Sequence, residues 1–296
     1  MAKLTYKLRC LFGVCLPRIA QLAFYVGKLR RWPHLKHPRD INEKIQWLKI
    51  HGDNRAIAPL ADKLAVREFV KERGLEDILV PLLGKFDSIE EFRAGWEGLQ
   101  TPFIIKANNS SQTLIVVKDK SKADLDAICR TIGKWMKDRI FWGFYMEPHY
   151  RYIKPCIIVE KFLEQEGSAA GMSSSLIDYK IWAFNGRAES VWACTNRDSR
   201  GLDAYLYDFD WHSHPEHQHF DHHFRRGAGE LPRPEGLERM RECAEILSKG
   251  FPQVRVDLYC VEKKVYFGEM TFTSSGGCMP FYTPAYLLKL GELCKL

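Results

Sequence analysis

Two short β-rich segments near the C-terminus place the strongest constraint on the fold. They are residues 254–260 and 265–272, and the charged pair Lys263-Lys264 between them is typical of a turn. Two such strands joined by a short turn predict an antiparallel hairpin. Side chains of a strand alternate between its two faces, so the pattern places three side chains on one face of each strand. These are Arg255, Asp257 and Tyr259 on the first strand, and Phe267, Glu269 and Thr271 on the second.

The two acidic residues of these triplets, Asp257 and Glu269, indicate a bound cation. Carboxylates that face the same way on adjacent strands repel each other unless positive charge lies between them. A Mg²⁺ ion, which prefers oxygen ligands and can bridge nucleotide phosphates, is the natural occupant of such a pair. Two unrelated solvated acids would produce the same spacing, so the pair alone leaves both interpretations open.

The remaining segments predict a mixture of helices and short strands. The first helical pattern covers residues 42–48, with Asp40 or Asn42 as its N-terminal cap. Further helices are expected at residues 59–74, 88–92, 125–137 and 234–250, and strands at residues 79–83, 103–106, 114–117, 156–163, 178–184 and 189–195. Asn185-Gly186, between the last two strands, is the strongest hairpin-turn signal in the chain. Several hairpins and few βαβ alternations favour an α+β fold with antiparallel sheets over a doubly wound fold.

Composition restricts the class of protein. A chain of 296 residues is long enough for two domains, and 46% apolar with 27% charged residues is typical of a soluble globular protein. The nine cysteines are scattered and form no CxxC pair. This argues against a disulfide framework and against a cysteine-based zinc site. We therefore expect a cytoplasmic protein in a reducing compartment.

Positive charge is concentrated at the N-terminus. Residues 1–39 contain nine Lys or Arg and no acid, so the rest of the chain carries −2 of the total charge of +7. The apolar runs at residues 10–16 and 22–26 are too short to span a bilayer, but interleaved bulky apolar and basic residues suit an element on an anionic membrane face. A helix docked on the body with its basic face in water explains the pattern equally well. Nucleic-acid binding fits less well, because no recognition motif accompanies the charge.

A candidate phosphate-binding loop follows the expected strand 103–106. Lys106 ends this strand, and a run of small polar residues follows it, including Asn109, Ser110 and Ser111. Exposed backbone N–H groups of such a loop can cradle phosphate oxygens, and the lysine supplies positive charge. The loop is not a Walker A sequence, because the glycines are missing and the lysine precedes it. An ordinary hairpin loop would have the same composition.

A second candidate site lies where the strand 156–163 opens into a loop, at Glu160-Lys161-Phe162-Leu163. The backbone of a strand end offers C=O and N–H groups that can read an adenine edge, and Glu164 or Glu166 can accept from ribose hydroxyls. Further along, Lys180 and Arg197 supply the cations that a γ-phosphate or an acyl phosphate needs.

The order of these features resembles that of ATP-grasp enzymes and, more narrowly, of the TupA-like ATP-grasp family, named for teichuronopeptide biosynthesis. Separated motifs carry the resemblance over residues 32–292. They are Asn42-Glu-Lys-Ile-Gln-Trp-Leu-Lys49, Asp62-Lys-Leu-Ala-Val-Arg67, Phe103-Ile-Ile-Lys-Ala-Asn108, Asp178-Tyr-Lys180, and Val254-Arg-Val-Asp-Leu-Tyr259 with Tyr266-Phe-Gly-Glu-Met-Thr-Phe272.

The resemblance implies an ATP-grasp fold, in which two α+β lobes with antiparallel sheets grip ATP. We expect a basic segment at residues 1–39, an N-terminal and small-lobe region at 40–155, and a C-terminal lobe with the hinge and the metal site at 156–296. The resemblance also implies ATP-dependent carboxylate–amine ligation. In that chemistry a carboxylate attacks the γ-phosphate to give an acyl phosphate, and an amine then displaces phosphate.

The resemblance assigns roles to individual residues of this chain. Lys106 and Lys161 would contact the α- and β-phosphates, and Glu160 and Leu163 would line the adenine pocket. Asp257 and Glu269 would hold Mg²⁺, and Arg255 would face the transferring phosphoryl group. Together with the residues singled out above, this makes Lys180, Arg197 and Arg255 the candidate catalytic residues, with Asn109, Ser110, Ser111, Glu164 and Glu166 as further candidate contacts to ATP.

Two positions depart from the family pattern. Thr271 stands where many ATP-grasp enzymes have Asn as a further metal ligand, so a second metal ion is in doubt. The loop after the lysine commonly reads His-Gly-Ser-Gly, whereas this chain has Asn109-Ser-Ser-Gln112. Loss of both glycines stiffens the loop and restricts how closely its backbone can approach a phosphate.

A histidine-rich segment stands outside these motifs. Residues 212–223 hold six of the ten histidines, among several acidic and basic residues. Such a tract can bind metal or titrate near neutral pH, but a solvated excursion is the commoner explanation of this composition. Its position between a hairpin and a helix makes it a candidate lid or acceptor-binding loop.

Three functions are compatible with the sequence. The first is an ATP-dependent ligase that joins an amine to a carboxylate of a cell-surface polysaccharide or glycan precursor, at the inner face of the membrane. The second is a phosphotransferase that stops after phosphorylation of a sugar or glycan acceptor, with the same ATP site. The third is a catalytically silent nucleotide-binding module, which Thr271 and the loop at residues 109–112 would favour. The retention of Lys106, Lys180, Asp257 and Glu269 argues against the third.

Overall fold

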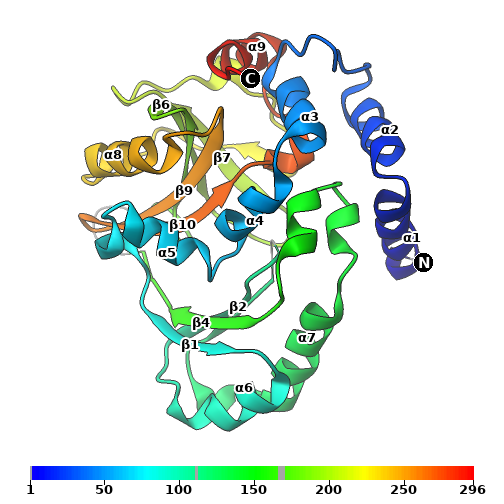
Figure 1. The fold of residues 1–296 in the computed structure, drawn as a ribbon. Helices are drawn as coiled ribbons and strands as arrows, with labels where there is room; N and C mark the ends of the chain where they lie inside the picture. Colours follow the sequence, from blue (N-terminus) through cyan, green and yellow to red (C-terminus); the bar gives the residue numbers. More distant parts are fainter. Residues whose placement is uncertain (1, 111–112, 166–170) are drawn as a thin grey trace.

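The fold is built on two sheets that lie one above the other in the view of Figure 1, and all their strand pairs are antiparallel except one parallel pair at the edge of the larger sheet. The computed structural model describes residues 2–110, 113–165 and 171–296. The strand order is β1-β4-β2-β3 in the four-stranded sheet and β10-β9-β5-β6-β7-β8 in the six-stranded sheet. This mixture of helices and antiparallel sheets confirms the α+β class expected from the sequence.

The helices of the described residues are α1 (Ala2–Cys15), α2 (Pro17–Leu29), α3 (Ile41–His51), α4 (Asn54–Ala61), α5 (Val66–Glu72), α6 (Ile89–Gly95), α7 (Leu125–Lys137), α8 (Leu237–Ser248) and α9 (Pro284–Leu293). The strands are β1 (Leu82–Phe86), β2 (Phe103–Ala107), β3 (Leu114–Val117), β4 (Ile157–Lys161), β5 (Asp178–Phe184), β6 (Arg187–Thr195), β7 (Leu202–Tyr207), β8 (Phe224–Arg226), β9 (Val254–Val261) and β10 (Lys264–Thr271). Short 3-10 turns join them, of which η4 (Phe141–Gly143), η7 (Pro215–His217) and η8 (Ser274–Gly277) matter below.

The four-stranded sheet packs one face against α6 and α7, which lie beneath it in Figure 1. Phe103, Ile105 and Val159 alternate along β2 and β4 and bury their side chains with Phe92 of α6 and Ile132 of α7. This is the two-residue period of a strand with one covered face. β4 pairs with β1 and β2 in this sheet. The expected boundary at residue 155 would have assigned this strand to the second lobe.

The six-stranded sheet has apolar side chains on both faces. One face packs against α5 and α8 and forms the largest core cluster. On the other face, α3 and α9 cover the region of β5 to β7 around Trp182 and Trp192. Strands β5, β9 and β10 carry polar residues on that second face, beyond the area that α3 and α9 cover. The expected hairpins 178–195 and 254–272 are both confirmed.

A β-bulge in β10 changes one expected side-chain direction. Phe267 lies opposite Leu258, whereas Glu269 lies opposite Asp257, so Gly268 is the additional residue. A Cβ atom on Gly268 would lie 2.9 Å from the carbonyl oxygen of Asp257, so the close approach of the two strands requires glycine there. The expectation that Phe267 shares a face with Glu269 was therefore wrong, because the bulge turns Phe267 into the core.

The helix expected at residues 59–74 is interrupted. α4 ends at Ala61 and α5 begins at Val66. The cause is Asp62, whose Oδ1 atom accepts hydrogen bonds from the backbone N–H groups of Leu64 and Ala65 at 2.8 and 3.3 Å. An aspartate that captures nearby N–H groups competes with the helical pattern. The interruption places Lys63 in a turn rather than on a helix.

The N-terminal helices α1 and α2 lie along one side of the molecule (Figure 1). α1 contacts the 3-10 turn η4, and the contact is backbone to backbone at Gly13 and Gly143. A Cβ atom on Gly13 would lie 1.9 Å from the carbonyl oxygen of Gly143. In the described part of the chain, no helix has the length and hydropathy needed to cross a bilayer.

We predict that Gly13→Ala weakens the docking of α1, because its Cβ atom clashes with Gly143 and forces the two backbones apart. The expected loss of stability is about 1–3 kcal/mol, as for overpacking at a tight contact. Gly27→Ala is the matched control. Gly27 is also helical but has no atom within 4 Å of the added Cβ, so helix propensity alone should leave it neutral or slightly more stable. Thermal unfolding together with limited proteolysis of the N-terminal helices would measure both variants, and equal stability of the two would contradict the proposed contact.

Candidate functional site

A buried cluster of charged residues lies on the polar face of β5, β9 and β10. Lys180 of β5 lies opposite Asp257 of β9, which in turn lies opposite Glu269 of β10. Residues opposite each other on adjacent strands share a face, so the three side chains meet. The expectation that Asp257 and Glu269 face the same way is confirmed by this register.

Asp257 is the centre of the cluster. Only 1% of this residue is exposed, and Arg255 binds its carboxylate with two N–H groups, from Nε to Oδ1 and from Nη2 to Oδ2, both at 2.7 Å. Lys180 also donates to Oδ2 of Asp257. Burial opposes ionisation of Asp257, but Arg255 and Lys180 outweigh it and hold its pKa below the ordinary value. Asp257 is therefore a carboxylate at neutral pH.

Lys180 is held between two carboxylates. Its Nζ atom lies 2.5 Å from Oδ2 of Asp178, in addition to its contact with Asp257. Burial alone would lower the pKa of Lys180, but the two carboxylates raise it above the ordinary value. The ammonium group is thus fixed in position and fully charged, because buried charges persist only when they are paired.

Asp178 has unused capacity for a ligand. Its Oδ1 atom is buried and has no hydrogen-bond partner in the part of the chain that the structure describes. Burial raises the pKa of Asp178, against the opposing effect of Lys180. Arg197, whose side chain is 47% exposed, approaches Oδ2 of Asp178 at 3.4 Å. Arg197 is therefore the most solvent-exposed cation of the group.

Glu269 is the most accessible carboxylate of the cluster, with 35% of its side chain exposed. Its nearest cations are Lys63 at 3.6 Å and Arg255 at 3.9 Å, both longer than a hydrogen bond. Thr271 lies on the same face, and its hydroxyl accepts a hydrogen bond from Nη2 of Arg255 at 3.2 Å. Thr271 thus helps to orient Arg255.

These residues fit a Mg²⁺ ion. Glu269 has free oxygen lone pairs, Oδ1 of Asp257 accepts only one hydrogen bond in the described structure, and Oδ1 of Asp178 accepts none. The potential metal ligands on this face are carboxylate and hydroxyl oxygens, which hard divalent cations prefer. Asp257 and Glu269 would hold the ion, with Thr271 beside them. This assignment remains a prediction.

The four-stranded sheet presents a second charged group. Lys106 of β2 donates to Oε2 of Glu160 at 2.8 Å, and Arg67 of α5 donates to Oε1 of the same carboxylate at 3.1 Å. Arg67 also donates to the carbonyl of Val80 at 2.9 Å. Glu160 is buried, and both its oxygens are occupied. Its side chain therefore positions Lys106 and Arg67, and only its backbone remains for a nucleotide base.

The uncovered face of the four-stranded sheet is apolar around Lys106. Leu114 lies opposite Lys106, and the neighbouring pairs along β1 and β3 place Leu82 and Val116 on the same face as Lys106. All three of these apolar residues are exposed. Exposed apolar side chains beside a fixed cation suit a partly apolar ligand with an anionic tail.

Other predicted ATP contacts are scattered. Lys161 lies opposite Phe103, so its side chain is on the face of α6 and α7 and is not beside Lys106. Leu163 is half-buried next to this strand end. Glu164 forms an exposed ion pair with Lys118 at 2.5 Å. Ser111 and Glu166 lie outside the described residues.

Lys63 connects the two charged groups, and the sequence analysis did not identify it as a site residue. Its Nζ atom donates to the carbonyl of Ser110 at 2.6 Å and lies 3.6 Å from Glu269. Its backbone N–H donates to the carbonyl of Asn108 at 3.0 Å. Asn109 in the same loop is buried, and its Oδ1 atom has no partner among the described residues. The loop after β2 is thus held next to the carboxylates of β10.

The motif at residues 62–67 contained the signal that was missed. Both Lys63 and Arg67 belong to it, but they were expected only as members of a single helix at residues 59–74. The role of Lys63 became visible only because Asp62 interrupts the helix. Asp178 was likewise within a motif, and alternation along the expected strand 178–184 places it on the same face as Lys180, a signal that could have identified it.

The turn after β10 is anchored by a buried lysine. Lys49 of α3 donates to the carbonyls of Gly276 and Tyr145 at 2.9 and 3.0 Å. Burial lowers the pKa of Lys49 to about 8. Nearby, Thr273 donates to the buried carboxyl of Glu147, whose pKa is raised by burial. These contacts fix η8, whose Ser274 binds Arg255, so they set the position of the guanidinium group.

We predict that Lys180→Met lowers the free energy of unfolding by about 3–5 kcal/mol, because Asp178 and Asp257 would remain buried without their shared cation. Arg197→Met is the matched control, since it removes a half-exposed cation from the same Asp178. It should change stability by less than about 1 kcal/mol. Urea unfolding of both variants provides the measurement. A similar loss in the two would mean that Lys180 is not the cation that compensates the buried carboxylates.

The model of the family described as TupA-like ATPgrasp matches residues 43–295. No curated protein sequence matches the chain significantly.

Solved structures similar to this chain include three ligases. D-alanine–D-alanine ligase from Bacillus anthracis in complex with ATP has 14% identity and a TM-score of 0.48, over 86% of this chain and 73% of that one. N5-carboxyaminoimidazole ribonucleotide synthetase in complex with ADP has 10% identity and a TM-score of 0.46, over 78% and 50%. Phosphoribosylamine–glycine ligase from Thermotoga maritima has 13% identity and a TM-score of 0.45, over 81% and 56%.

The match covers 50% of the synthetase and 56% of the phosphoribosylamine–glycine ligase, and 65% of a second structure of the Bacillus anthracis ligase, so this chain spans less than two thirds of the length of these proteins. The family match, in contrast, covers most of this chain, including both sheets and both charged groups. The chain belongs to the TupA-like ATP-grasp family.

Proposed function

We propose that this chain is an ATP-dependent carboxylate–amine ligase that works through an acyl phosphate on a cell-surface polysaccharide or glycan precursor. The observation that carries the proposal is the contact of Lys63, which brings the loop after β2 next to Glu269 of β10. A phosphate chain that leaves the four-stranded sheet at Lys106 would therefore enter the carboxylate and cation cluster of the six-stranded sheet.

The apolar face around Leu82, Leu114 and Val116 would receive the adenine ring. The triphosphate would run past Lys106 towards the loop, where the backbone of Asn109 and Ser110 offers N–H groups. Lys106 would keep its position through Glu160, which it shares with Arg67. Each of these groups would be in place before ATP binds, which reduces the ordering that binding requires.

The charged cluster would act on the γ-phosphate. Lys180 and Arg255 are buried, paired and charged, so they can stabilise the negative charge of the transferring phosphoryl group without reorganising. Arg197 is half-exposed, so its guanidinium group could contact an acceptor that enters from solvent. Asp257 and Glu269 would hold Mg²⁺, which when bound would neutralise the negative charge of the phosphate oxygens.

The chemical steps balance without a further reactant. A carboxylate oxygen of the acceptor attacks the γ-phosphorus, the bond to the bridging β–γ oxygen breaks, and ADP leaves. The nitrogen of an amine then attacks the acyl carbon, inorganic phosphate leaves with the oxygen that had attacked, and the nitrogen loses a proton. Lys180 and Arg255 would stabilise the acyl phosphate between the two steps.

Helix α1 is apolar on two opposite faces, one buried and one exposed, and the exposed face supports action at a membrane surface. Cys10 and Gly13 of α1 are buried against the body of the protein. The opposite face of α1 and its continuation into α2 expose a stripe of apolar side chains spaced three or four residues apart. They are Leu4, Leu8, Leu11, Phe12, Leu16 and Ile19. A stripe of this length is unusual on a protein surface unless something covers it.

The charge around this stripe favours a lipid occupant. Lys7 and Arg18 are exposed beside it, and residues 1–39 contain no acidic residue. Apolar side chains that enter the headgroup region, with basic residues around them, bind anionic bilayers. The enzyme would thus be held peripherally on the inner face of the membrane, where lipid-linked or polymeric acceptors are found.

The ligase reaction is tested by Mg²⁺-ATP turnover with hydroxylamine and a panel of uronic-acid and amino-acid carboxylates. We expect ADP together with a hydroxamate. Glu269→Gln should lower both by about 10²-fold, because it removes a charge from a preorganised site. Glu262→Gln, an exposed position in the turn of the same hairpin, should leave both unchanged.

Two other outcomes would replace the proposal. ADP release with a stable phosphoproduct, no hydroxamate and no dependence on amine would identify a phosphotransferase. Measurable ATP binding with no ADP release from any carboxylate, amine or sugar acceptor would identify a nucleotide-binding module. Both outcomes contradict ligation.

Membrane binding is tested by cosedimentation with vesicles. The wild-type chain should bind vesicles that contain anionic lipid and release them at high salt. Leu8→Glu with Leu11→Glu should abolish binding, because both charges fall within the apolar stripe. Leu288→Glu, at an exposed position on α9, is the matched control and should bind as wild type does. Equal binding of the double variant, or no binding by the wild type, would show that the stripe does not face lipid.

A further inference from the structure

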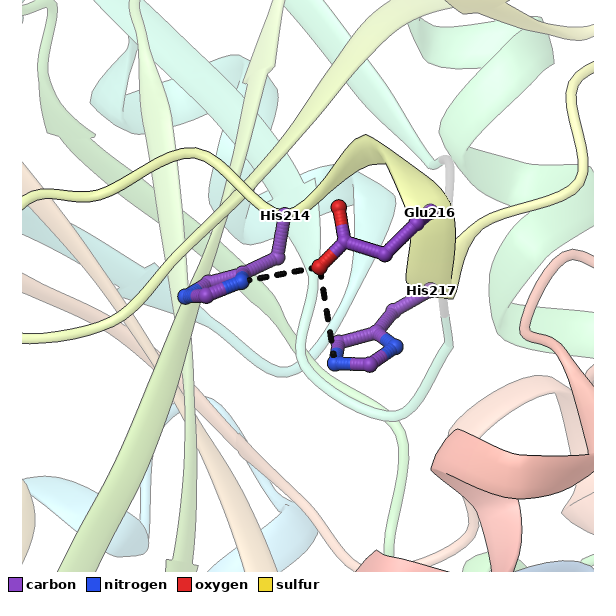
Figure 2. Close-up of side chains that lie close together, drawn as sticks. All are labelled: His214, Glu216 and His217. Atoms are coloured by element: carbon purple, nitrogen blue, oxygen red, sulfur yellow. Dashed lines mark hydrogen bonds and ion pairs between the residues drawn. The ribbon is translucent and has the colours of Figure 1, made fainter.

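A cluster of metal-ligating side chains lies outside the candidate ATP site, in the histidine-rich connection between β7 and β8. His214, Glu216 and His217 surround the turn η7, and Figure 2 shows their side chains turned towards one another. One ligand atom from each lies within 4.8 Å of the others. Composition alone favoured a solvated excursion for this segment, but the tertiary structure gathers these three groups.

The spacing of the ligand atoms is close to that of a coordination shell. Oε1 of Glu216 lies 3.0 Å from Nδ1 of His214 and 3.8 Å from Nε2 of His217. Zinc binds imidazole nitrogen and carboxylate oxygen at about 2.0–2.2 Å, which places ligand atoms of a tetrahedral site roughly 3.3–3.6 Å apart. Small rotations of the side chains would therefore complete the shell.

The surroundings of His214 call for a cation. Nδ1 of its ring faces Glu216, and Nε2 faces Oδ2 of Asp208 at 3.1 Å. A neutral imidazole has only one N–H, so one of these two contacts would bring a nitrogen lone pair against a carboxylate. A metal ion at Nδ1 removes this repulsion, and the N–H at Nε2 then donates to Asp208. A carboxylate behind the ligating histidine is the usual arrangement in zinc proteins.

The rigid part of the protein holds the cluster in place. The ring of His217 stacks on Tyr286 of α9, with 4.8 Å between the ring centroids and 14° between the planes. The carbonyl of His217 accepts from the N–H of Thr283 at 3.0 Å, and the N–H of His219 donates to the carbonyl of Phe281 at 2.8 Å. The ligands therefore need little ordering when an ion binds.

One side of the cluster is open. His214 and His217 line a cavity of about 40 Å³ with Tyr286 and Lys289. This is enough room for a water molecule as a fourth ligand. The charge of Lys289 does not repel an ion strongly, because its Nζ atom is paired with Glu189 at 2.8 Å.

We propose that His214, Glu216 and His217 form a binding site for a zinc-class divalent ion, with Asp208 orienting His214. The ion would fix the conformation of the turn η7, which packs on α9 through His217 and Tyr286. Two imidazoles and one carboxylate suit zinc rather than Mg²⁺, which binds nitrogen ligands poorly. The site is independent of the proposed ligase reaction.

The test uses the full, tag-free chain, stripped with a chelator and titrated with Zn²⁺ by calorimetry in excess Mg²⁺. Excess Mg²⁺ competes for the oxygen ligands at Asp257 and Glu269. We expect one zinc ion per chain and a higher melting temperature. His214→Gln with His217→Gln should weaken binding at least 100-fold and remove the thermal shift. Asp208→Asn should weaken it about 10- to 100-fold, as for other carboxylates behind a metal-bound histidine.

The matched control is His222→Gln with His223→Gln, two exposed histidines of the same segment that lie outside the cluster. This variant should bind zinc as wild type does. No stoichiometric binding by the wild type would overturn the proposal and leave His214 as an imidazolium clamped by two carboxylates. Unchanged binding by the His214 and His217 variant, or equal loss in the control variant, would also overturn it. Glu269→Gln should leave zinc binding unchanged, which separates this site from the ATP site.

Discussion

The ion pairs of Asp257 are the interaction on which the rest of the site depends. A carboxylate that is almost fully buried is stable only when cations compensate it, and Arg255 and Lys180 do so from two different strands. Lys180 also compensates Asp178, while Arg255 reaches Thr271 and the turn after β10. The requirement for charge balance therefore fixes Lys180 and Arg255 relative to Asp257, whereas Arg197 stays half-exposed at the edge of the group.

The two sheets meet through a second electrostatic contact. Lys63 binds the backbone of the loop after β2 and approaches Glu269, so it links a loop of one sheet to a carboxylate of the other. This contact is weaker than those at Asp257, because 3.6 Å is too long for a hydrogen bond and Glu269 is partly exposed. A weak, accessible contact between two ordered groups is suited to replacement by a ligand, which supports the proposal that ATP binds at this position.

Local patterns predicted much of the fold and part of the site. The two hairpins, the strands around Lys106 and the helix at residues 125–137 followed from turn signals and periodicity. The pairing of Asp257 with Glu269 followed from alternation along two strands. Alternation failed at Phe267, because the bulge at Gly268 shifts the register by one residue. Periodicity failed at Asp62, whose side chain takes the N–H groups that would continue the helix.

The sequence by itself determined the α+β class, the resemblance to the TupA-like ATP-grasp family and the facing carboxylates, because these depend on the order and spacing of residues within short segments. Only the tertiary structure decided which charges pair. The contacts of Lys63 with Ser110, of Arg67 with Glu160 and of His217 with Tyr286 join residues more than 45 positions apart. Such contacts arise because buried polar groups must find partners wherever the fold brings them, and no local pattern records that choice.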